Sequence, residues 1–378
     1  MSEIYEGAID RGLEGIVACK TSISSIVDVT LCYRGYSIED LAENSNFEEV
    51  AYLLWEDRLP RRGELETFRK EVGQSMKLEP ELVKLLQALP TKNVHPMAWL
   101  RTATSMLALW DNEAQSTASD ARNRVAVRLL ARMGALVALL ERTRQGKSYV
   151  EPRSGESIAW NFLYMMTGEK PDEEMVKVLD VCLILHADHE LNCSAFAARV
   201  TASSLSDIYS AVTSAIGALK GPLHGGANEQ VMKMLLEIGS LENARTWVKQ
   251  ALTQKKKVMG FGHRVYKNGD PRARILSTMS KSLTLKTGRP HLYEMSKLIH
   301  DTVEGEKGLL PNVDFYSATV YYSMGIPLDL YTPIFAVSRV SGWLAHIFEQ
   351  YSNNRIYRPR GQWVGQEGLK WLPPDSRG

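Results

Sequence analysis

The sequence predicts a mostly α-helical protein with a small β element near its N-terminus. It also predicts a large helical domain that carries a smaller inserted helical domain. Apolar residues recur at helical spacing in one segment after another beyond residue 46. Strand-favouring residues gather only between 15 and 36. The 378 residues are too many for one ordinary domain, and two breaks rich in Gly and Pro divide the helical part.

The segment 15–36 reads GIVACKTSISSIVDVTLCYRGY. It is rich in Ile, Val, Thr and Tyr, and it contains Gly and Asp, which form turns. This composition predicts two or three short strands, and we expect little strand elsewhere.

Helix signals follow from Ser37, a predicted N-cap with Asp40 at the third position. Asn46 is a second predicted N-cap, and Pro80 lies where a first helical residue is tolerated. Helices are expected over 37–41, 46–54, 65–72, 80–89, 96–110, 121–142, 158–166, 173–186, 208–219, 224–238, 241–255, 272–286, 291–303 and 333–350.

The domain boundaries follow from two interruptions. Gly221-Pro222 ends one helix, and Gly325-Ile326-Pro327 breaks a later apolar run. The helices between these points are shorter and more charged. We therefore assign residues 1–222 together with 326–378 to the large domain and 223–325 to the small domain. Hinges near Gly221 and Gly325 would permit closure.

Composition excludes several classes of partner. The formal net charge of +1 gives no indication of a nucleic-acid or membrane partner, so any anion site has to be local. A hydrophobic content of 44% and a charged content of 24% are typical of a soluble globular protein. The most apolar helical segment, 125–140, is interrupted by Arg128 and Arg132, which predicts a buried helix and not a membrane span.

A cytoplasmic location is expected from two further features. Cys19, Cys32, Cys182 and Cys193 contain no CxxC pair, which fits reduced thiols better than a disulfide framework or a zinc site. The first ten residues, MSEIYEGAID, are acidic and short of apolar residues, so they predict neither a secretory signal nor a transit peptide.

The stretch Val258–Arg272, VMGFGHRVYKNGDPR, combines close glycines, His263, cationic residues and an Asp-Pro-Arg turn. Such a mixture is poor core material. It predicts a loop whose backbone approaches a ligand, with His263 available for proton transfer or hydrogen bonding. The alternative is a basic surface connection. Lys255, Lys256 and Lys257, just before it, form either a solvated face or a phosphate contact.

Three more histidines have conspicuous neighbours. His186 and His189, in HADHELN, would share a face if the helix continued. Their spacing matches no zinc helix, so we expect no metal, a structural role for His186 and a substrate hydrogen bond for His189. His224, in GPLHGGANEQ, precedes a predicted helix whose positive end disfavours an imidazolium. We expect it to stay neutral and to donate to a developing oxyanion; the alternative is a turn histidine.

One carboxylate and several arginines complete the candidate site. Asp314, in PNVDFYSATVYY, has apolar neighbours that would raise its pKa as a base, and the alternative is an N-cap. Arg339 interrupts an apolar helix, and an unpaired guanidinium is unfavourable there. Together with Arg272 and with Arg358 or Arg360 it would match a small polycarboxylate, the alternative being surface ion pairs. The residues alone thus predict a two-domain helical enzyme with a polyanion site at a hinged cleft.

Six motifs follow one another along the chain: HADHELN, GPLHGGANE, GFGHRVYKNGDPR, PNVDFYS, VSRVSGWLAH and RPR. Together they resemble the citrate synthase family in its short form, and earlier segments extend the likeness to nearly the whole chain. The resemblance implies a citrate synthase-like fold and a homodimer with shared active sites. It implies an acyltransferase of the tricarboxylic acid cycle that condenses acetyl-CoA with oxaloacetate and hydrolyses citryl-CoA. It implies no metal and no cofactor beyond the coenzyme A thioester substrate.

The same resemblance implies a role for each matching residue. Asp314 would remove the methyl proton of acetyl-CoA, His224 would hydrogen-bond the thioester carbonyl, and His263 would protonate the oxaloacetate carbonyl. The residues that would hold oxaloacetate are His189, Arg272, Arg339 and Arg358, the last from the partner subunit. Those that would line the coenzyme A site are Lys256, Lys257, Val258, Met259, Gly260 and Lys267.

Two positions depart from the family pattern. Cys193 stands where a small residue such as Ala is expected, and Lys267 stands where other members carry Arg. Two alternative functions stay open. One is a 2-methylcitrate synthase that uses propionyl-CoA, because one extra methylene changes the binding energy little. The other is a non-catalytic sensor that binds coenzyme A or a polyanion.

Overall fold

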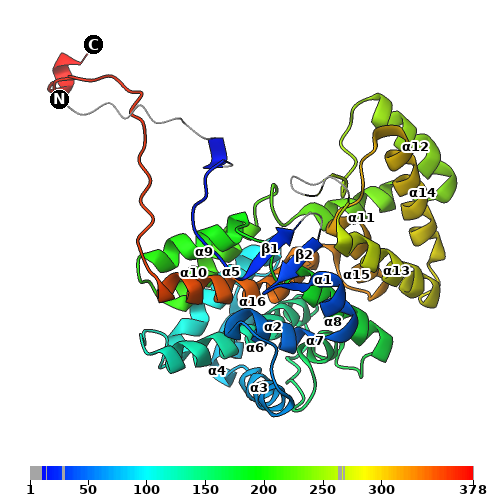
Figure 1. Cartoon of the computed structure of the whole chain (residues 1–378), viewed down its shortest axis with the longest axis horizontal. Coiled ribbons are helices and arrows are strands. Elements are labelled where there is room, and N and C mark those ends of the chain that lie inside the picture. Colours follow the sequence, from blue (N-terminus) through cyan, green and yellow to red (C-terminus); the bar gives the residue numbers. More distant parts are fainter. Residues whose placement is uncertain (1–10, 14, 28–29, 263–265, 267–268, 378) are drawn as a thin grey trace.

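We describe the fold from a computed structural model of the chain. The structure describes residues 11–13, 15–27, 30–262, 266 and 269–377. Within these ranges the chain forms sixteen α-helices and a small sheet (Figure 1). The predicted fold class, mostly helical with a small N-terminal β element, is confirmed.

The sheet consists of β1 (Ser24–Val27), β2 (Thr30–Tyr33) and β3 (Tyr36–Ser37) in the antiparallel order β1-β2-β3. It lies in the predicted segment. Tyr33 at the end of β2 is fully buried, and its hydroxyl reaches the segment that follows α8. The sheet therefore helps to position a loop that carries candidate site residues.

The helices before residue 222 occur where they were predicted, with one exception. They are α1 (Ile38–Asn44), α2 (Phe47–Glu56), α3 (Arg62–Ser75), α4 (Pro80–Ala88), α5 (Pro96–Leu107), α6 (Ser119–Arg144), α7 (Ile158–Thr167), α8 (Glu173–His186), α9 (Cys193–Ser203) and α10 (Ile208–Leu219). The helix α9 was not predicted, because its small residues give a weak apolar pattern. Four short 3₁₀ segments also occur, at Arg11–Leu13, Ala108–Trp110, Leu328–Leu330 and Pro374–Ser376.

Side-chain caps explain many of the helix starts. Ser37 accepts a hydrogen bond from the N–H of Asp40, and Asn46 accepts one from Glu49, as predicted. Asn192 caps α9 in the same way, through the N–H of Ala195. Each cap satisfies a donor that the first helical turn leaves without a partner.

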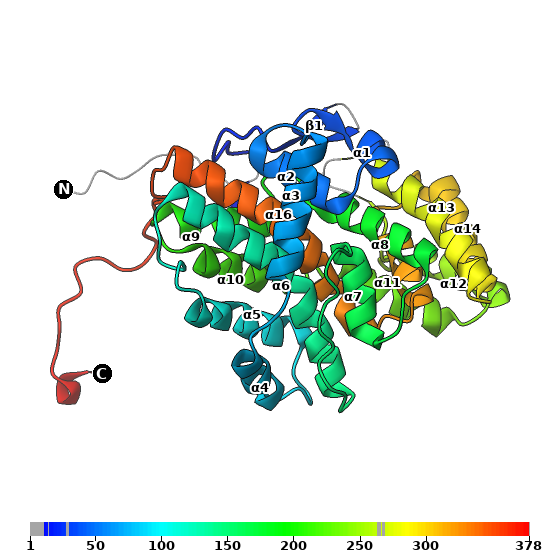
Figure 2. The same cartoon turned by 90° about the horizontal axis from the view of Figure 1, so that it is seen from below.

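The helix α16 (Tyr331–Ser352) runs obliquely through the body (Figure 2). It is buried along most of its length and packs against α2, α6, α8, α9 and α10. Trp343 and Arg339 are its largest buried side chains. A buried arginine in such a helix requires polar surroundings, and these lie at the candidate site.

A second group of helices comprises α11 (Ala227–Ile238), α12 (Leu241–Thr253), α13 (Pro271–Lys286), α14 (Pro290–Lys307) and α15 (Val313–Ser323). Figure 1 shows α11 to α14 together at one end of the molecule. The helix α15 packs on α11 and α13, and α12 packs on α14. These helices fall within the predicted small domain, and the boundaries at 222/223 and 325/326 stay a prediction.

Asn354 and Tyr357, beyond α16, still bond to Ser203 on α9, and the chain after them leaves the body as an extended tail (Figure 1). The apolar side chains beyond α16 are largely exposed, and they are Ile356, Trp363, Val364, Leu369, Trp371 and Leu372. Within the described ranges, no helix is both long and apolar enough to cross a membrane.

Candidate active site

The loop between α8 and α9 carries the first candidate residues. The helix α8 ends at His186, so His186 and His189 do not share a helical face. The side chain of Asp188 is fully buried and accepts hydrogen bonds from Ser24 (2.5 Å) and His346 (3.3 Å). The backbone of Asp188 also exchanges hydrogen bonds with the hydroxyl of Tyr33. The loop is thus held from the sheet and from α16.

Close packing at Gly342 keeps α16 against this loop. A Cβ at Gly342 would lie 2.4 Å from the carbonyl oxygen of Ala187 and 2.5 Å from Oδ1 of Asp188. Any larger residue would push the helix and the loop apart. Because Arg339 lies one turn earlier on α16, this contact also places Arg339 beside the loop.

His189 is partly buried and faces Tyr266, which comes from the glycine-rich stretch. Its Nε2 lies 3.2 Å from the Tyr266 hydroxyl, and the two rings are nearly perpendicular, at 80°. This contact joins the loop after α8 to the segment that leads into α13.

His224 faces the N-terminus of α9. Its Nε2 lies 2.9 Å from Oγ of Ser194 and 3.3 Å from the backbone nitrogen of Ser194. A backbone N–H can only donate, so Nε2 is the acceptor and the ring proton is on Nδ1. Oγ of Ser194 also contacts Asn192 (2.8 Å) and accepts a hydrogen bond from Nε1 of Trp343 (3.0 Å). The imidazole therefore has a fixed orientation and a donor nitrogen free of Ser194.

The surroundings keep His224 neutral, in agreement with the sequence prediction. Burial lowers its pKa to about 4, and the positive charge of Arg339 adds to this effect. The structure also places His224 beside a helix end that was not predicted. The imidazole lies at the N-terminus of α9, in addition to the predicted N-terminus of α11, which begins three residues after His224.

Asp314 lies at the second position of α15. Its neighbour Asn312 is the N-cap and accepts a hydrogen bond from the Asp314 backbone nitrogen at 3.1 Å. The Asp314 carboxylate is therefore not needed for capping, and the N-cap alternative is wrong. Burial raises the pKa of Asp314 to about 6, although Arg272 and Arg339 oppose the shift. Such a carboxylate is a stronger base than one in water.

The glycine-rich loop is attached to the start of α15. Gly260 accepts a hydrogen bond from the backbone nitrogen of Asn312 (2.9 Å), and Gly262 donates one to Leu310 (3.0 Å). The side-chain nitrogen of Asn312 donates to the Gly262 carbonyl at 3.0 Å. Gly260 has a φ of +81°, and a Cβ there would lie 2.8 Å from Val231. Only glycine fits this position without strain. The hydrogen bonds through Asn312 join this loop to the helix that carries Asp314.

Arg272 is the second residue of α13 and is almost fully buried. Its Nε and Nη2 bind the two carboxylate oxygens of Asp270, at 2.9 and 2.8 Å. Asp270 also caps the helix and accepts a hydrogen bond from the N–H of Val313 at 3.0 Å. The ion pair raises the pKa of Arg272 against the opposing effect of burial. Asp270 thus connects Arg272 directly to the helix that carries Asp314.

Arg339 has a different environment. Its Nε donates to the carbonyl oxygen of His186 at 2.7 Å, and its guanidinium carbon lies 4.6 Å from the Phe335 ring centre. No carboxylate of the described residues forms an ion pair with it. Burial lowers its pKa to about 10, so it stays charged at neutral pH. A buried cation that lacks an ion-pair partner favours a bound anion.

His186 is also buried, and only one of its two ring nitrogens has a hydrogen-bond partner among the described residues. Its Nδ1 lies 2.7 Å from the carbonyl oxygen of Cys182, so Nδ1 donates and Nε2 is unprotonated. Within the described ranges Nε2 has no hydrogen-bond partner. Burial lowers the pKa of His186 to about 3, with a contribution from the positive charges of Arg272 and Arg339. The predicted structural role accounts for Nδ1 but not for this second nitrogen.

Comparison with known proteins decides the family. The model of the family described as "Citrate synthase, C-terminal domain" matches residues 12–360. The chain belongs to the citrate synthase family. It is accordingly an enzyme of the transferase class.

Individual members are similar to the chain along its length. "Citrate synthase 2" of Bacillus subtilis (strain 168) is 56% identical over 367 residues, which cover 97% of this chain and 99% of the relative. "2-methylcitrate synthase 2" of Corynebacterium glutamicum is 40% identical over 384 residues, which cover 100% of each chain. The citrate synthase of Thermoplasma acidophilum, solved as a ternary complex with carboxymethyl coenzyme A and oxaloacetate, is 34% identical with a TM-score of 0.90, over 98% of this chain and 100% of that one.

The remaining residues that the family resemblance singles out differ in exposure, and some of them are not described. His263 and Lys267 are outside the described residues. Lys256 and Lys257 are exposed, whereas Val258 and Gly260 are buried beside them. Arg358 and Arg360 are both exposed, directly after Tyr357, whose backbone N–H donates to Ser203 on α9.

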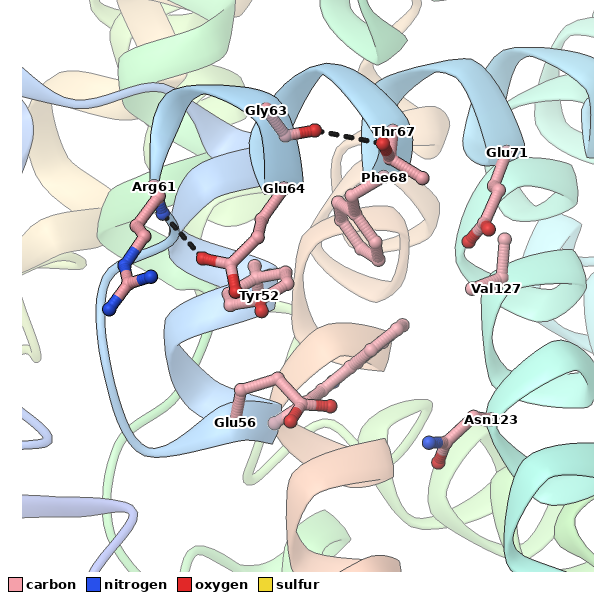
Figure 3. A pocket seen from close by; sticks show the side chains of 11 residues that line it. Tyr52, Glu56, Arg61, Gly63, Glu64, Thr67, Phe68, Glu71, Asn123 and Val127 are labelled. Carbon is pink, nitrogen blue, oxygen red and sulfur yellow. Dashed lines mark hydrogen bonds between the residues drawn. The ribbon is translucent and has the colours of Figure 1, made fainter.

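Metal ligands and cavities are two further aspects of the structure. Within the described ranges, no group of three His, Cys, Asp or Glu side chains is arranged to hold a metal ion. A cavity of about 670 Å³ opens between α2, α3 and α6 (Figure 3). Its lining includes Tyr52, Phe68, Glu64 and Glu71, and none of the predicted site residues.

Sequence reasoning missed four residues that organise the site. Ser194 holds His224, Asn312 holds Asp314, Asp270 holds Arg272, and Tyr266 contacts His189. A signal existed for Asp270 and Asn312, because Asp and Asn directly before a helix are typical N-caps. The contacts of Ser194 and Tyr266 are long-range, and no local pattern predicts them.

Proposed function

We propose that the chain is a working citrate synthase that condenses acetyl-CoA with oxaloacetate and hydrolyses citryl-CoA in the tricarboxylic acid cycle. One observation carries the proposal. The positive charge of Arg339 lowers the pKa of both His224 and Asp314, which come from different parts of the chain. The buried cation therefore acts on both the neutral histidine and the carboxylate with the raised pKa, which supports a single site.

Asp314 is the proposed base and His224 the proposed oxyanion donor. A methyl proton next to a thioester is weakly acidic, so its removal needs a base and a donor to the developing enolate oxygen together. The pKa of Asp314 near 6 leaves the carboxylate ionised at neutral pH yet more basic than usual. The Nδ1 proton of neutral His224 is the group available to the enolate oxygen.

Oxaloacetate is the proposed anion for the buried arginines. Arg339 would bind one carboxylate, and its lack of an ion-pair partner among the described residues supports this assignment. Arg272 and His189 would complete the site in the same subunit. His263, from the segment joined to Gly262, would bind and protonate the reacting carbonyl. The charge on oxaloacetate would compensate the positive charge that the protein buries here.

The proposed coenzyme A site includes the exposed lysines before the glycine-rich loop. Lys256 and Lys257 would contact phosphates, as would Lys267. The buried side chain of Val258 gives it no direct access to a ligand, so Val258, Met259 and Gly260 would contribute through their backbone. This loop is joined to Asp314 through Asn312, so coenzyme binding and the base are mechanically connected.

We further propose a homodimer in which Arg358 of each chain completes the oxaloacetate site of the other. The support is the tail, which extends from the body with Trp363, Val364 and Trp371 exposed (Figures 1 and 2). Apolar side chains of this size are unfavourable in water unless a partner covers them. Arg360 is the alternative residue for the crossing contact.

The remaining parts of the proposal concern cofactor and location. The side chains present supply the base and the oxyanion donor, so the reaction would need no metal or organic cofactor. A cytoplasmic location is supported by the four cysteines, none of which forms a disulfide. The proposal includes no nucleic-acid or membrane partner.

The test is oxaloacetate-dependent release of free thiol from acetyl-CoA, measured with a thiol reagent, with citrate identified as the product. No release would contradict the enzymatic proposal and favour the non-catalytic sensor. A second assay compares kcat/KM for acetyl-CoA and propionyl-CoA, because relatives named 2-methylcitrate synthase are 40% identical to the chain. A clear preference for propionyl-CoA would make the chain a 2-methylcitrate synthase.

A further inference from the structure

Tyr266 belongs to none of the roles proposed above, yet it contacts two of the residues proposed to hold oxaloacetate. It is 5% exposed. Its hydroxyl lies 3.2 Å from Nε2 of His189, and the guanidinium carbon of Arg272 lies 5.9 Å from its ring centre. A buried tyrosine in this position is in contact with one binding residue through its hydroxyl and with another through its ring.

The contact also joins two parts of the fold. Tyr266 precedes α13, in the helical group at one end of the molecule, whereas His189 lies on the loop after α8 in the other group. The loop after α8 is held in place by Asp188, which accepts hydrogen bonds from Ser24 and His346. The Tyr266 hydroxyl therefore makes a direct polar contact between the glycine-rich stretch and the loop after α8.

We propose that Tyr266 is a positioning residue for oxaloacetate binding, which fixes the ring of His189 through its hydroxyl and supports Arg272 through its ring. This inference rests on the proposed function. The hydrogen bond between the Tyr266 hydroxyl and Nε2 holds the orientation of the His189 ring. Burial raises the pKa of Tyr266, so its hydroxyl stays protonated at neutral pH and keeps this contact.

The contact between the Arg272 guanidinium and the Tyr266 ring is a second, separate interaction. The Arg272 guanidinium is held on one side by Asp270, at 2.8 and 2.9 Å, and lies near the Tyr266 ring on another. Aromatic rings attract cations at this range. Removing the hydroxyl alone should therefore disturb His189 and leave Arg272 supported, whereas removing the ring should disturb both.

The test uses Tyr266→Phe and measures the Kd of oxaloacetate by calorimetry, together with kcat and KM. We expect Kd and KM for oxaloacetate to rise about tenfold, the usual effect of losing one hydrogen bond, with kcat changed less than about twofold. The KM for acetyl-CoA should not change. Tyr266→Leu, which also lacks the ring, should raise Kd further.

Tyr316→Phe is the matched control. Tyr316 is 1% exposed, and its hydroxyl lies 2.8 Å from Nδ1 of His300, so the variant removes a similar tyrosine–histidine contact. We expect the Kd of oxaloacetate to be unchanged in this control. Melting curves of both variants define a temperature at which each is folded, and Kd is measured there.

A double-mutant cycle with His189→Ala identifies the route of the effect. If Tyr266 acts through His189, Tyr266→Phe should add little in the His189→Ala background. An unchanged Kd in Tyr266→Phe would overturn the inference, and so would a full tenfold effect without His189. Failure of the wild-type protein to bind oxaloacetate at all would instead overturn the proposed function together with this inference.

Discussion

Nε2 of His224 lies 3.3 Å from the backbone nitrogen of Ser194, at the first turn of α9. The N-terminal end of a helix carries partial positive charge, which disfavours a protonated imidazole next to it. Ser194 therefore does two things for His224: it fixes the tautomer and it opposes protonation. A neutral donor with a fixed orientation is what a developing enolate oxygen requires.

The Ser194 hydroxyl should matter for turnover more than for binding. Ser194→Ala keeps the backbone contact but removes the 2.9 Å contact between Oγ and His224. We expect kcat to fall about tenfold, the effect of losing one orienting hydrogen bond, with the KM for oxaloacetate nearly unchanged. Thr201→Val, on the same helix, removes a hydroxyl that donates to the backbone carbonyl of Ala197 and should leave kcat intact. Equal kcat in the two variants would contradict this role.

Replacing the base should abolish turnover without abolishing binding. Asp314→Asn keeps the shape of the side chain and its backbone contact with Asn312. Because a general base contributes about 10²–10⁴ in rate, kcat should fall by at least that range. Oxaloacetate affinity, measured by calorimetry, should stay within about threefold. Loss of oxaloacetate binding would assign Asp314 a structural role.

The raised pKa of Asp314 also predicts a pH-dependent effect on stability. The carboxyl group titrates near 6 in the folded protein and near 3.9 in the unfolded chain. Between these values the folded protein holds a proton that the unfolded chain has lost, so stability falls as the pH rises from about 4 to about 6. Above about pH 6 the loss is complete.

Asparagine cannot ionise, so Asp314→Asn should be more stable than the wild type at pH 7.5 and not at pH 4. Denaturant unfolding at the two pH values measures the difference. An equal effect of the substitution at both values would show that the Asp314 pKa is not raised.

Two glycines in the loop allow a matched test of close packing. Gly260 and Gly262 both have positive φ, +81° and +78°, but only at Gly260 would a Cβ meet neighbours within 3 Å. Gly262→Ala should cost about 1 kcal/mol from backbone strain alone. Gly260→Ala should cost at least about 2 kcal/mol more from the clash with Val231 and Phe315, and should lower kcat because the loop is joined to Asp314. Equal losses would exclude the packing argument.

Substitutions and a mixed dimer test whether Arg358 reaches the active site of the partner subunit. Arg358→Ala should raise the KM for oxaloacetate by about 10–100-fold, since a hydrogen-bonded charge is lost. Arg360→Ala is the control and should have little effect. In a mixed dimer of Arg358→Ala and Asp314→Asn chains, crossing predicts one site with both residues intact and therefore normal KM. If Arg358 acts within its own chain, no site in the mixed dimer has both residues, and the KM stays high.

The sequence predicts most helices because their caps and apolar spacing are local. Ser37 and Asn46 cap the helices expected of them, and the segment from 173 to 186 is helical over its whole predicted length. The helix α9 was not predicted, because Ser194, Ala195 and Ala198 on its buried face are small and give little apolar signal. Small residues give a weak hydrophobic pattern even where they are fully buried.

The site was predictable only in part. The residue types of His224, Asp314 and Arg339 indicated their chemistry. Their environments depend on contacts between distant segments, and sequence spacing does not contain these. The neutral state of His224 was predicted from the N-terminus of the helix that follows it, whereas the position of α9 beside it is a tertiary feature and was not predicted. The Asp270–Arg272 pair was missed although both residues were noticed, since the side-chain direction at a helix start is not visible in the sequence.

The central claim is that Asp314 removes the methyl proton of acetyl-CoA in a site that oxaloacetate completes. The direct measurement is deuterium incorporation from D₂O into the methyl group of acetyl-CoA, followed by mass spectrometry, with malate present as a dicarboxylate that cannot condense. We predict incorporation by the wild-type protein that depends on malate, and none above background by Asp314→Asn. Incorporation by Asp314→Asn at the wild-type rate would contradict the claim.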